Sequence, residues 1–372
     1  MDRTAKSVTR GRRKRLALLL PGYNEELIIA ATITSALAAG LKKEDIYVVD
    51  DGSEDKTCRE ARKILSKKNI LSVVHGGKAR AVQQAIRHFH LIEQYTWLHV
   101  ADADSVFCTD YFKIYKRNLN SKECVAAVGF VQSMRGNWIA HYRAFSYTCG
   151  QHIFRRIQSW FGVITVMPGP VACFQTNVLK HLSFSTSSLT EDLDLTIQIH
   201  RKQLGTIKFI PEAVNFTQDP RTIRDFCKQT MRWHRGFFQA VRKYRLGTRP
   251  RLFDVSVGYQ VSESLFYFLQ LFVFFPLVAL QLHNWRALPV ALAFDYLVVC
   301  ALAVLATLAA RRPTILLSMT YFYILRFLEV VLFARAFIEV IIARRFTEPT
   351  EGWETKGRRY ALDTKALEDS AS

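Results

Sequence analysis

Two carboxylates stand two residues apart in Asp102-Ala103-Asp104, directly after the apolar run Leu98–Ala101. If that run is a β-strand, its two-residue period aims both carboxylates to one side. Mg²⁺ and Mn²⁺ prefer oxygen ligands, and they bind such acids together with phosphate oxygens. The pair is therefore a candidate metal and diphosphate site, although a solvated loop with two acids gives the same pattern.

A second acidic cluster, Asp50-Asp51-Gly52-Ser53, follows the apolar run Ile46–Val49. Its glycine lets the backbone turn, and its carboxylates can accept hydrogen bonds from a nucleobase or a ribose. An ordinary strand-to-helix turn with Ser53 or Asp55 as the N-cap explains the same residues. Taken alone, this cluster is better explained as such a turn than as a nucleotide contact.

Two further turns contain residues suited to a nucleotide. Gly76-Gly77-Lys78 combines a permissive backbone with a cation ahead of a helix predicted over Arg80–Phe89, which suits a phosphate at a helix N-terminus. Pro21-Gly22-Tyr23-Asn24-Glu25 is predicted to open a helix after the first strand, with Tyr23 against a nucleobase. In isolation, a solvated turn explains either segment equally well.

Thr190-Glu191-Asp192 precedes an apolar element, with Thr190 as a possible N-cap. Acids in the first turn of a helix are routine, because they lie at the positive end of the helix dipole. The chemical interpretation is that Asp192 acts as a general base and takes the proton from an attacking hydroxyl. The residues fit either description.

The clearest amphipathic helix is predicted over Arg221–Tyr244. With about 100° between successive residues, its basic side chains share one face and its large apolar side chains another. Such a helix can lie on acidic lipid headgroups. Gln229, Arg232 and Trp233 can also line one rim of this helix, with Arg232 on a diphosphate and Trp233 stacked on a sugar.

Short apolar runs alternate with helical patterns through residues 16–210, which predicts an α/β fold with a βαβ sheet. Acidic or glycine-rich clusters follow several of the predicted strands, at the end where ligands bind in an open α/β sheet. The predicted strands are Leu16–Leu20, Ile46–Val49, Ile70–Val74, Leu98–Ala101, Val125–Val128 and Thr206–Ile210.

The composition describes a globular chain with anionic partners. Its 372 residues can fill one large core and form a few additional helices. The formal net charge of +19 favours phosphorylated ligands, acidic lipids or nucleic acid as partners. The seven cysteines are scattered and form no Cys-x-x-Cys, which argues against a disulfide framework or a zinc site and favours a reducing cytosolic setting.

The composition becomes strongly apolar from Val257 onward. The stretches Leu265–Leu282 and Ala287–Ala310 are each long enough to cross the ~30 Å hydrocarbon core of a bilayer, and both are predicted to be membrane spans. Near the N-terminus, the apolar run after the basic segment Arg3–Arg15 is too short for a span.

The third apolar stretch, Thr314–Ala343, contains charged side chains that are costly in lipid unless they pair or face protein. Arg344-Arg345 follow it, and the positive-inside rule places that end in the cytosol. We therefore predict a partly embedded or interfacial helix. The charged residues are Arg326, Glu329, Arg335 and Glu339.

Taken in order ahead of the apolar tail, the acidic clusters and Gln229-Thr230-Met231-Arg232-Trp233 resemble the motifs of the membrane-bound family 2 glycosyltransferases. That family includes cellulose, chitin, hyaluronan and poly-N-acetylglucosamine synthases. The resemblance extends from about Leu16 to Trp233. It implies a GT-A fold and a reaction that turns an α-linked UDP-sugar into a β-glycoside by single displacement.

The resemblance also implies roles for individual residues. It implies that Asp192 is the general base, that Asp104 binds Mg²⁺ or Mn²⁺, and that Glu191 and Trp233 contact the acceptor. Contacts with the nucleotide-sugar are expected at Pro21, Tyr23, Glu25, Asp50, Asp51, Lys78, Asp102, Gln229 and Arg232.

The sequence departs from the family pattern in several places. No span precedes the predicted catalytic domain, so a secretion channel built from this chain alone is not expected. Trp353-Glu354-Thr355-Lys356 resembles the gating loop of hyaluronan-type synthases, but Glu354 replaces a glycine. Gln83, after the Gly77-Lys78-Ala79 segment, stands where asparagine is common.

We therefore expect a basic arm over residues 1–15, a GT-A domain over 16–220, an interfacial region over 221–256, membrane helices over 257–343 and a cytosolic tail over 344–372. The expected enzyme is a multi-pass membrane protein with a cytosolic catalytic domain, which extends a polysaccharide from UDP-N-acetylglucosamine. Its expected partners are a glycan or lipid acceptor, membrane lipids, and a partner subunit or second copy, but not nucleic acid.

Two alternatives stay open. In the first, the enzyme adds a single sugar to a lipid acceptor, which fits the small number of predicted spans. In the second, a non-catalytic basic protein binds membrane or nucleic acid through Arg221–Arg245 and the N-terminal arm. Such a protein would tolerate Asp104→Ala, whereas either enzyme would not.

Overall fold

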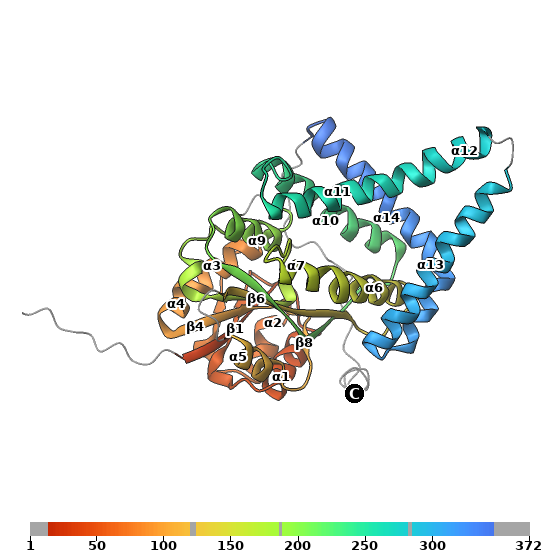
Figure 1. The fold of residues 1–372 in the computed structure, drawn as a ribbon. Coiled ribbons are helices and arrows are strands. Elements are labelled where there is room, and N and C mark those ends of the chain that lie inside the picture. Colours follow the sequence, from red (N-terminus) through yellow and green to blue (C-terminus); the bar gives the residue numbers. More distant parts are fainter. Residues whose placement is uncertain (1–13, 120–123, 186–187, 282–284, 346–372) are drawn as a thin grey trace, which may run out of the picture.

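The computed structural model describes residues 14–119, 124–185, 188–281 and 285–345. Within these residues, an eight-stranded mixed sheet forms the centre of one domain, and long helices extend from that domain (Figure 1). The strands are β1 (Lys14–Gly22), β2 (Ile46–Asp50), β3 (Ile70–Ser72), β4 (Tyr95–Val100), β5 (Val106–Phe107), β6 (Cys124–Ser133), β7 (Ala172–Gln175) and β8 (Thr206–Thr217).

Helices pack around this sheet and connect its strands (Figure 1). They are α1 (Ile29–Ala38), α2 (Thr57–Arg62), α3 (Lys78–His88), α4 (Leu91–Gln94), α5 (Tyr111–Asn118), α6 (Trp138–Cys149), α7 (Arg156–Trp160), α8 (Thr176–Leu179), α9 (Glu191–Arg201) and α10 (Ile223–Tyr244). A π-helical segment, Gly150–Arg155, joins α6 to α7.

The strands follow the spatial order β3-β2-β1-β4-β7-β6-β8-β5. β1 pairs in parallel with β2 and β4, and β2 pairs in parallel with β3. β7 runs antiparallel to both β4 and β6. Because β1 to β4 run in one direction, the segments that follow Gly22, Asp50, Ser72 and Val100 meet at the same edge of the sheet.

The sheet buries alternate residues on its two faces. In β1, Leu16, Leu18 and Leu20 belong to one apolar cluster with side chains of α1, whereas Ala17 and Leu19 belong to another with side chains of α3. This alternation is the two-residue period of a strand. Burial on both faces explains why the strands read as continuous apolar runs in the sequence.

The predicted α/β class is confirmed, with differences at individual elements. All predicted strands occur, but β5 and β7 were missed because runs of two and four residues carry little pattern. The prediction that Pro21–Glu25 opens a helix is wrong. Pro21 and Gly22 pair with Val49 and Asp50 as the end of β1, and the next helix begins at Ile29.

Beyond the sheet domain, α11 (Leu252–Leu269), a π-helical segment (Gln270–Phe274) and α12 (Phe275–Gln281) form one continuous helix, and α13 (Ala287–Ala310) follows. Of the described helices, two are long and apolar enough to cross a membrane, at Leu252–Val278 and Leu288–Ala310. Figure 1 shows them projecting away from the sheet. Many of their large apolar side chains are exposed, as expected of surfaces that would face lipid.

Both ends of this pair of helices are fastened to the sheet domain. At the start of α11, the Asp254 carboxylate pairs with the Arg201 guanidinium of α9 at 2.6 Å. After α13, the buried Arg312 side chain donates from Nη1 to the carbonyl of Ser133, the last residue of β6. The helical hairpin therefore starts and ends at the same domain.

The third apolar stretch consists of a 3₁₀ segment (Pro313–Tyr321), α14 (Phe322–Phe337) and a π-helical segment (Ile338–Ile342). α14 packs along α10, where Phe333 contacts Phe238. Glu339 of the following π-helical segment pairs with Arg235 of α10 at 2.7 Å. Unlike α13, this stretch is not one of the candidate spans among the described residues. That it is partly embedded or interfacial stays a prediction.

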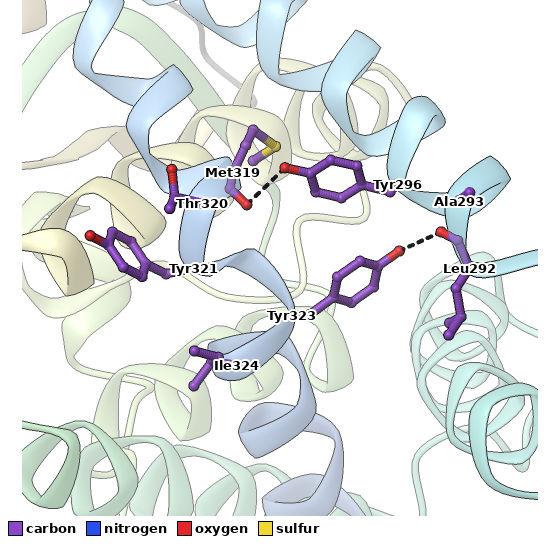
Figure 2. Close-up of a pocket in the computed structure, with 8 residues that line it drawn as sticks. All are labelled: Leu292, Ala293, Tyr296, Met319, Thr320, Tyr321, Tyr323 and Ile324. Carbon is purple, nitrogen blue, oxygen red and sulfur yellow. Dashed lines mark hydrogen bonds between the residues drawn. The ribbon is translucent and has the colours of Figure 1, made fainter. Parts of the chain in front are cut away.

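A pocket of about 370 Å³ lies between α13 and the segment Pro313–Tyr321 with the start of α14 (Figure 2). Beside it, the Tyr296 hydroxyl donates to the carbonyl of Met319 at 3.1 Å, and the Tyr323 hydroxyl donates to the carbonyl of Leu292 at 2.9 Å. The two segments are thus joined by hydrogen bonds as well as by apolar contact. The predicted gating-loop segment Trp353–Lys356 lies outside the described residues, as does the basic arm up to residue 13.

Gly129 of β6 offers a test of the packing between β6 and β8. A Cβ added there would lie 2.6 Å from the carbonyl oxygen of Ala213 and 3.0 Å from the Tyr115 hydroxyl. We expect Gly129→Ala to lower the free energy of unfolding by about 1–3 kcal/mol, because overpacking displaces neighbours in a dense core. Thermal unfolding in detergent measures the change.

The matched control is Gly150→Ala, since no atom lies within 4 Å of its added Cβ. This variant should unfold at the temperature of the unchanged chain or above it. An unchanged unfolding temperature for Gly129→Ala would contradict the packing described here.

Candidate active site

Asp50 ends β2 and is almost fully buried. One carboxylate oxygen accepts the Ser53 N–H at 3.2 Å, and the other accepts the Cys58 thiol at 3.3 Å. The Ser53 hydroxyl in turn accepts the Asn24 N–H from the turn after β1 at 2.9 Å. Asp50 therefore shapes the turn in which sequence analysis predicted nucleotide contacts.

Asp51, the next residue, holds the glycine turn that precedes α3. Its side chain is fully buried, and its two oxygens accept the N–H groups of Gly76 at 3.0 Å and of Gly77 at 2.8 Å. Burial raises the pKa of Asp51 above its ordinary value, although these two hydrogen bonds oppose the shift. Gly77 has φ 87°, in the left-handed region that glycine adopts readily, and it is the residue before the first turn of α3.

An aromatic pair lies beside this turn. Tyr23 stacks on His75 with ring centroids 4.3 Å apart, and His75 Nδ1 lies 3.1 Å from Asp51 Oδ2. Tyr23 is a predicted nucleobase contact, whereas His75 was not among the predicted residues. The sequence signal for His75 was its position directly before Gly76-Gly77.

The other predicted residues of the first turn have different environments. Pro21 is buried inside β1, where it pairs with Val49. Glu25 is also buried, and its N–H donates to the Thr57 hydroxyl at 2.7 Å. The turn after β1 is thereby attached to the turn after β2.

Lys78 joins two of the acidic motifs. Its Nζ lies 2.5 Å from Asp102 Oδ1 and 3.0 Å from Glu191 Oε1. Burial alone would lower the pKa of Lys78, but the charges of Asp102 and Glu191 outweigh it and raise that pKa. Burial likewise acts to raise the pKa of Glu191, and the Lys78 charge outweighs it and lowers that pKa. The junction therefore keeps a fixed positive charge between carboxylates.

Asp192 lies in the first turn of α9, next to this junction. Its Oδ1 accepts the Leu193 N–H at 2.8 Å, and its Oδ2 accepts the Gly169 N–H at 3.2 Å. Burial, reinforced by the charge of Glu191, raises the pKa of Asp192 to about 6. A carboxylate with that pKa is suited to general base catalysis near neutral pH.

Pro168-Gly169-Pro170, which was not among the predicted segments, closes this region from the side of β7. A Cβ added at Gly169 would lie 2.8 Å from Lys78 Nζ and 3.1 Å from Asp102 Oδ1. Only a residue without a side chain leaves the Lys78–Asp102 pair this close to the backbone. A glycine between two prolines was the signal in the sequence.

Asp102 and Asp104 follow β4, and both are half-buried, with buried Ala103 between them. The Ala103 carbonyl accepts the Thr32 hydroxyl of α1 at 2.6 Å, which fixes this turn against α1. Among the described residues, no group of three or more His, Cys, Asp or Glu side chains is placed to hold a metal ion. The Asp pair instead fits a metal of the Mg²⁺ type, which binds one or two carboxylates and completes its shell with substrate phosphates.

The three predicted residues of α10 differ in their contacts. Arg232 is exposed, and its Nη1 lies 3.5 Å from the Leu189 carbonyl, just before the Thr190-Glu191-Asp192 motif. Trp233 is half-buried, with the Arg143 guanidinium 4.8 Å from its ring centroid. Gln229 Oε1 is buried without a hydrogen-bond partner in the described part of the chain.

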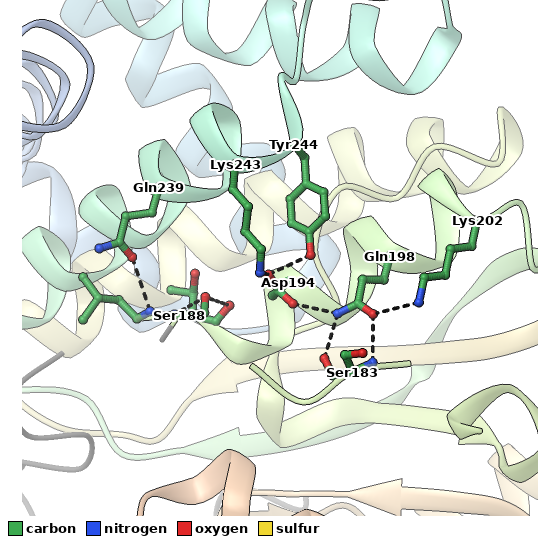
Figure 3. A network of polar contacts seen from close by, with 10 residues as sticks. Ser183, Ser188, Asp194, Gln198, Lys202, Gln239, Lys243 and Tyr244 are labelled. Carbon is green, nitrogen blue, oxygen red and sulfur yellow. Dashed lines mark hydrogen bonds and ion pairs between the residues drawn. The ribbon is translucent and has the colours of Figure 1, made fainter. Parts of the chain in front are cut away.

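A polar network fixes α10 relative to α9 (Figure 3). The buried Asp194 of α9 accepts hydrogen bonds from Lys243 Nζ at 2.6 Å and from the Tyr244 hydroxyl at 3.0 Å. Its other oxygen accepts Gln198 Nε2 at 2.7 Å. The helix that carries Asp192 is therefore attached to the helix that carries Arg232 and Trp233.

Thr190 and Gly236 form a second contact between these helices. The predicted N-cap hydrogen bond of Thr190 is absent, because its side chain packs against α10 instead. A Cβ added at Gly236 would lie 2.5 Å from Thr190 Cγ2. A glycine inside a strongly patterned helix was the sequence signal for this close approach.

Residues 14–236, more than half of the chain, match the family model described as glycosyltransferase like family 2. The chain belongs to this family, as the motifs predicted. The family match and the mixed sheet also confirm the expected GT-A class of fold.

Related sequences include poly-β-1,6-N-acetyl-D-glucosamine synthases. The synthase of Staphylococcus epidermidis is 26% identical over 227 residues, which cover 59% of this chain and 54% of the relative. The synthase of Staphylococcus aureus (strain COL) is 25% identical over 229 residues, with the same shares. The chain thus spans about half the length of these relatives.

Similar solved structures include a mannosyltransferase from Pyrobaculum calidifontis in complex with GDP-mannose and Mn²⁺. It is 18% identical with a TM-score of 0.49, and the match covers 87% of this chain and 88% of that one. Glucosyl-3-phosphoglycerate synthase from Mycobacterium tuberculosis is 16% identical with a TM-score of 0.43, over 62% and 79% of the two chains.

The close approach of α9 and α10 can be tested at Gly236. Because the added methyl group would overlap Thr190, we expect Gly236→Ala to destabilise the chain by about 1–3 kcal/mol. Thermal unfolding is the measurement, and Gly258→Ala, whose added Cβ meets nothing within 4 Å, is the control. Equal unfolding temperatures for the two variants would show that α9 and α10 are not in close contact at this point.

Proposed function

We propose that this chain is an inverting β-glycosyltransferase that uses UDP-N-acetylglucosamine and extends a poly-N-acetylglucosamine chain. The single observation that carries this proposal is the position of Asp192, a carboxylate with a pKa of about 6 beside the Lys78 junction. The family match supports sugar transfer, and the names of the related synthases support the choice of sugar.

The positive groups of the site suit a nucleoside diphosphate. Lys78 at the N-terminus of α3 would bind a phosphate, and Arg232 would approach the diphosphate from α10. The turns that contain Asp50, Asp51 and Glu25 would hold the nucleoside, with its base against Tyr23. Pro21 would shape this pocket from the end of β1, and Gln229 would contact the donor from α10.

Asp104, together with Asp102, would hold Mg²⁺ or Mn²⁺ against the diphosphate oxygens. When bound, that ion neutralises the negative charge that develops on the leaving diphosphate. Lys78 adds a second positive charge on the same side of the site, because it contacts Asp102 directly.

Asp192 would take the proton from an acceptor hydroxyl as its oxygen attacks the anomeric carbon. The new carbon–oxygen bond forms on the face opposite the diphosphate, whose bond to that carbon breaks. An α-linked donor therefore gives a β-linked product and UDP. Glu191 and Trp233 would position the acceptor sugar.

We place this reaction at the cytosolic face of a membrane. The support is the pair of candidate spans, which leave and re-enter the same domain, and the basic residues of α10. A partner subunit or a second copy would complete a pathway for a long product.

Transfer of a single sugar to a lipid acceptor is the second candidate. The pocket of about 370 Å³ beside α13 favours it, because that pocket lies next to a candidate span and has the apolar side chains of Leu292 and Ile324 in its lining. Product length distinguishes the two candidates.

The deciding experiment measures UDP release and product size from membranes that contain the chain, with Mn²⁺ or Mg²⁺ and a panel of UDP-sugars. We expect a long product from UDP-N-acetylglucosamine and no product from Asp192→Asn. A single-sugar lipid product would establish the second candidate. No donor-dependent UDP release would contradict both and favour a non-catalytic membrane-binding protein.

The pH dependence of transfer should report Asp192. The base acts only when ionised, and its raised pKa of about 6 places the loss of activity just below neutral pH. We expect kcat/KM to fall about tenfold for each pH unit below that pKa and to be level above it. A profile that stays level down to about pH 4, the ordinary pKa of an aspartate, would contradict this environment for the base.

Metal dependence should depend on Asp104. We expect chelation by EDTA to stop transfer and Mn²⁺ or Mg²⁺ to restore it. Asp104→Asn should need at least about tenfold more metal for half-maximal rate, because it loses a charged oxygen ligand. Asp110→Asn is the control, since Asp110 is an exposed partner of Lys113 on another turn. Equal metal requirements in the two variants would exclude Asp104 as the ligand.

A further inference from the structure

A buried ion pair joins α14 to the helix that carries Trp233. The Arg143 side chain of α6 is only 4% exposed, and its Nη1 lies 3.1 Å from Glu329 Oε1 of α14. Its Nη2 donates to the Thr230 hydroxyl of α10 at 2.8 Å. The second oxygen of Glu329 accepts the Tyr142 hydroxyl at 2.6 Å. Glu329, which would be costly alone in lipid, therefore faces protein and is fully engaged.

The same guanidinium contacts aromatic rings of α10. Arg143 Cζ lies 4.4 Å from the ring centroid of Phe226 and 4.8 Å from that of Trp233. A guanidinium is planar, so hydrogen bonds at its edge and aromatic contacts on its face can form together. Two hydrogen bonds to separate helices fix the orientation of that plane. The ring of Trp233 thereby lies against a guanidinium whose orientation is set by two other helices.

Thr230 strengthens this arrangement because it belongs to the same motif as Trp233. It is 1% exposed, and its hydroxyl receives the second hydrogen bond of Arg143. α6, α10 and α14 thus meet at the Arg143 guanidinium. Its contact on α10, Thr230, lies three residues before Trp233. In the sequence, Arg143 is 87 positions from Thr230 and 186 positions from Glu329, so no local pattern predicts these contacts.

We propose that Arg143, held by Glu329, is a positioning residue for the acceptor site, which it acts on through Trp233. This inference rests on the proposed function, in which Trp233 contacts the acceptor sugar. It assigns the third apolar stretch a task besides packing: α14 supplies the carboxylate that orients the acceptor-binding ring. The donor side of the site, around Lys78 and Asp102, does not contact this cluster in the described contacts.

The experiment compares three variants of the full chain in membranes. Arg143→Lys keeps the charge but loses the planar group, and Glu329→Gln keeps the shape but loses the charge. The double variant Arg143→Met with Glu329→Leu replaces the whole pair by apolar side chains, which avoids leaving one buried charge alone. Arg87→Lys and Glu93→Gln, both on the exposed surface, are the matched controls.

Two readouts are taken. The first is transfer from UDP-N-acetylglucosamine to a short β-1,6-linked N-acetylglucosamine oligosaccharide, alongside UDP release without that acceptor. The second is the emission of Trp233, obtained in each background as the difference from the same chain with Trp233→Phe. This second readout does not depend on activity.

We expect all three variants to raise the acceptor KM about fivefold or more, with the donor KM and acceptor-free UDP release unchanged. The emission of Trp233 should shift in wavelength, because its ring loses the planar charged group that it contacts. The controls should change neither quantity. The double variant distinguishes a positioning role of the Arg143–Glu329 pair from a purely stabilising one. Its acceptor KM should stay raised even when its unfolding temperature matches that of the unchanged chain.

Three results would overturn the inference. Unchanged emission of Trp233 in the double variant would show that Arg143 does not hold the ring. Recovery of the acceptor KM in the double variant would show that the pair only stabilises the fold. If the emission shifts but the unchanged chain transfers no sugar, the proposed function fails, and the acceptor role of this cluster fails with it.

Discussion

Lys78 brings a positive charge into a half-buried junction between carboxylates of two separate motifs, and the geometry of the site depends on this charge. Asp102 follows β4 and Glu191 begins α9, and both carboxylates contact Lys78 Nζ. Without Lys78 between them, their like charges would repel each other. The same charge acts against the high pKa of Asp192, which burial and Glu191 produce. Gly169 leaves the space that this pair requires. One lysine thus links the region suited to a diphosphate with the region suited to a base.

The scaffold around this junction explains why its parts meet. Parallel pairing of β1, β2, β3 and β4 brings their following turns to one edge of the sheet, where Asp51 and the glycine turn before α3 lock together. α9 is then fixed to α10 by the Asp194 network and by the close contact at Gly236. Asp192 of α9 and the residues of α10 therefore belong to helices that pack directly against each other.

The apolar C-terminal part is attached to this unit by charged groups. Arg312 and Asp254 fasten the two ends of the helical hairpin to the sheet domain. Glu329 fastens α14 to α6, and Glu339 fastens the π-helical segment after α14 to α10. Asp254, Glu329 and Glu339 each pair with an arginine, and such pairing is the condition under which charged residues are tolerated in lipid. The apolar helices and the sheet domain are thus continuous in structure as well as in sequence.

The sequence by itself determined the α/β class, the positions of six of the eight described strands, the family, and the acidic clusters at strand ends, because these depend on local periodicity and on the order of motifs. It also determined the extent of α10 to within two residues and of α13 to the residue. It misjudged the turn after β1, since the pairing of Pro21 with Val49 extends that strand. Only the tertiary structure decided that Lys78 joins Asp102 to Glu191, that Gly169 and Gly236 permit close contacts, and that Arg143 and Glu329 meet beside Trp233. Those contacts join residues far apart in the chain, and a pattern read along the chain carries no information about which distant side chains share one buried space.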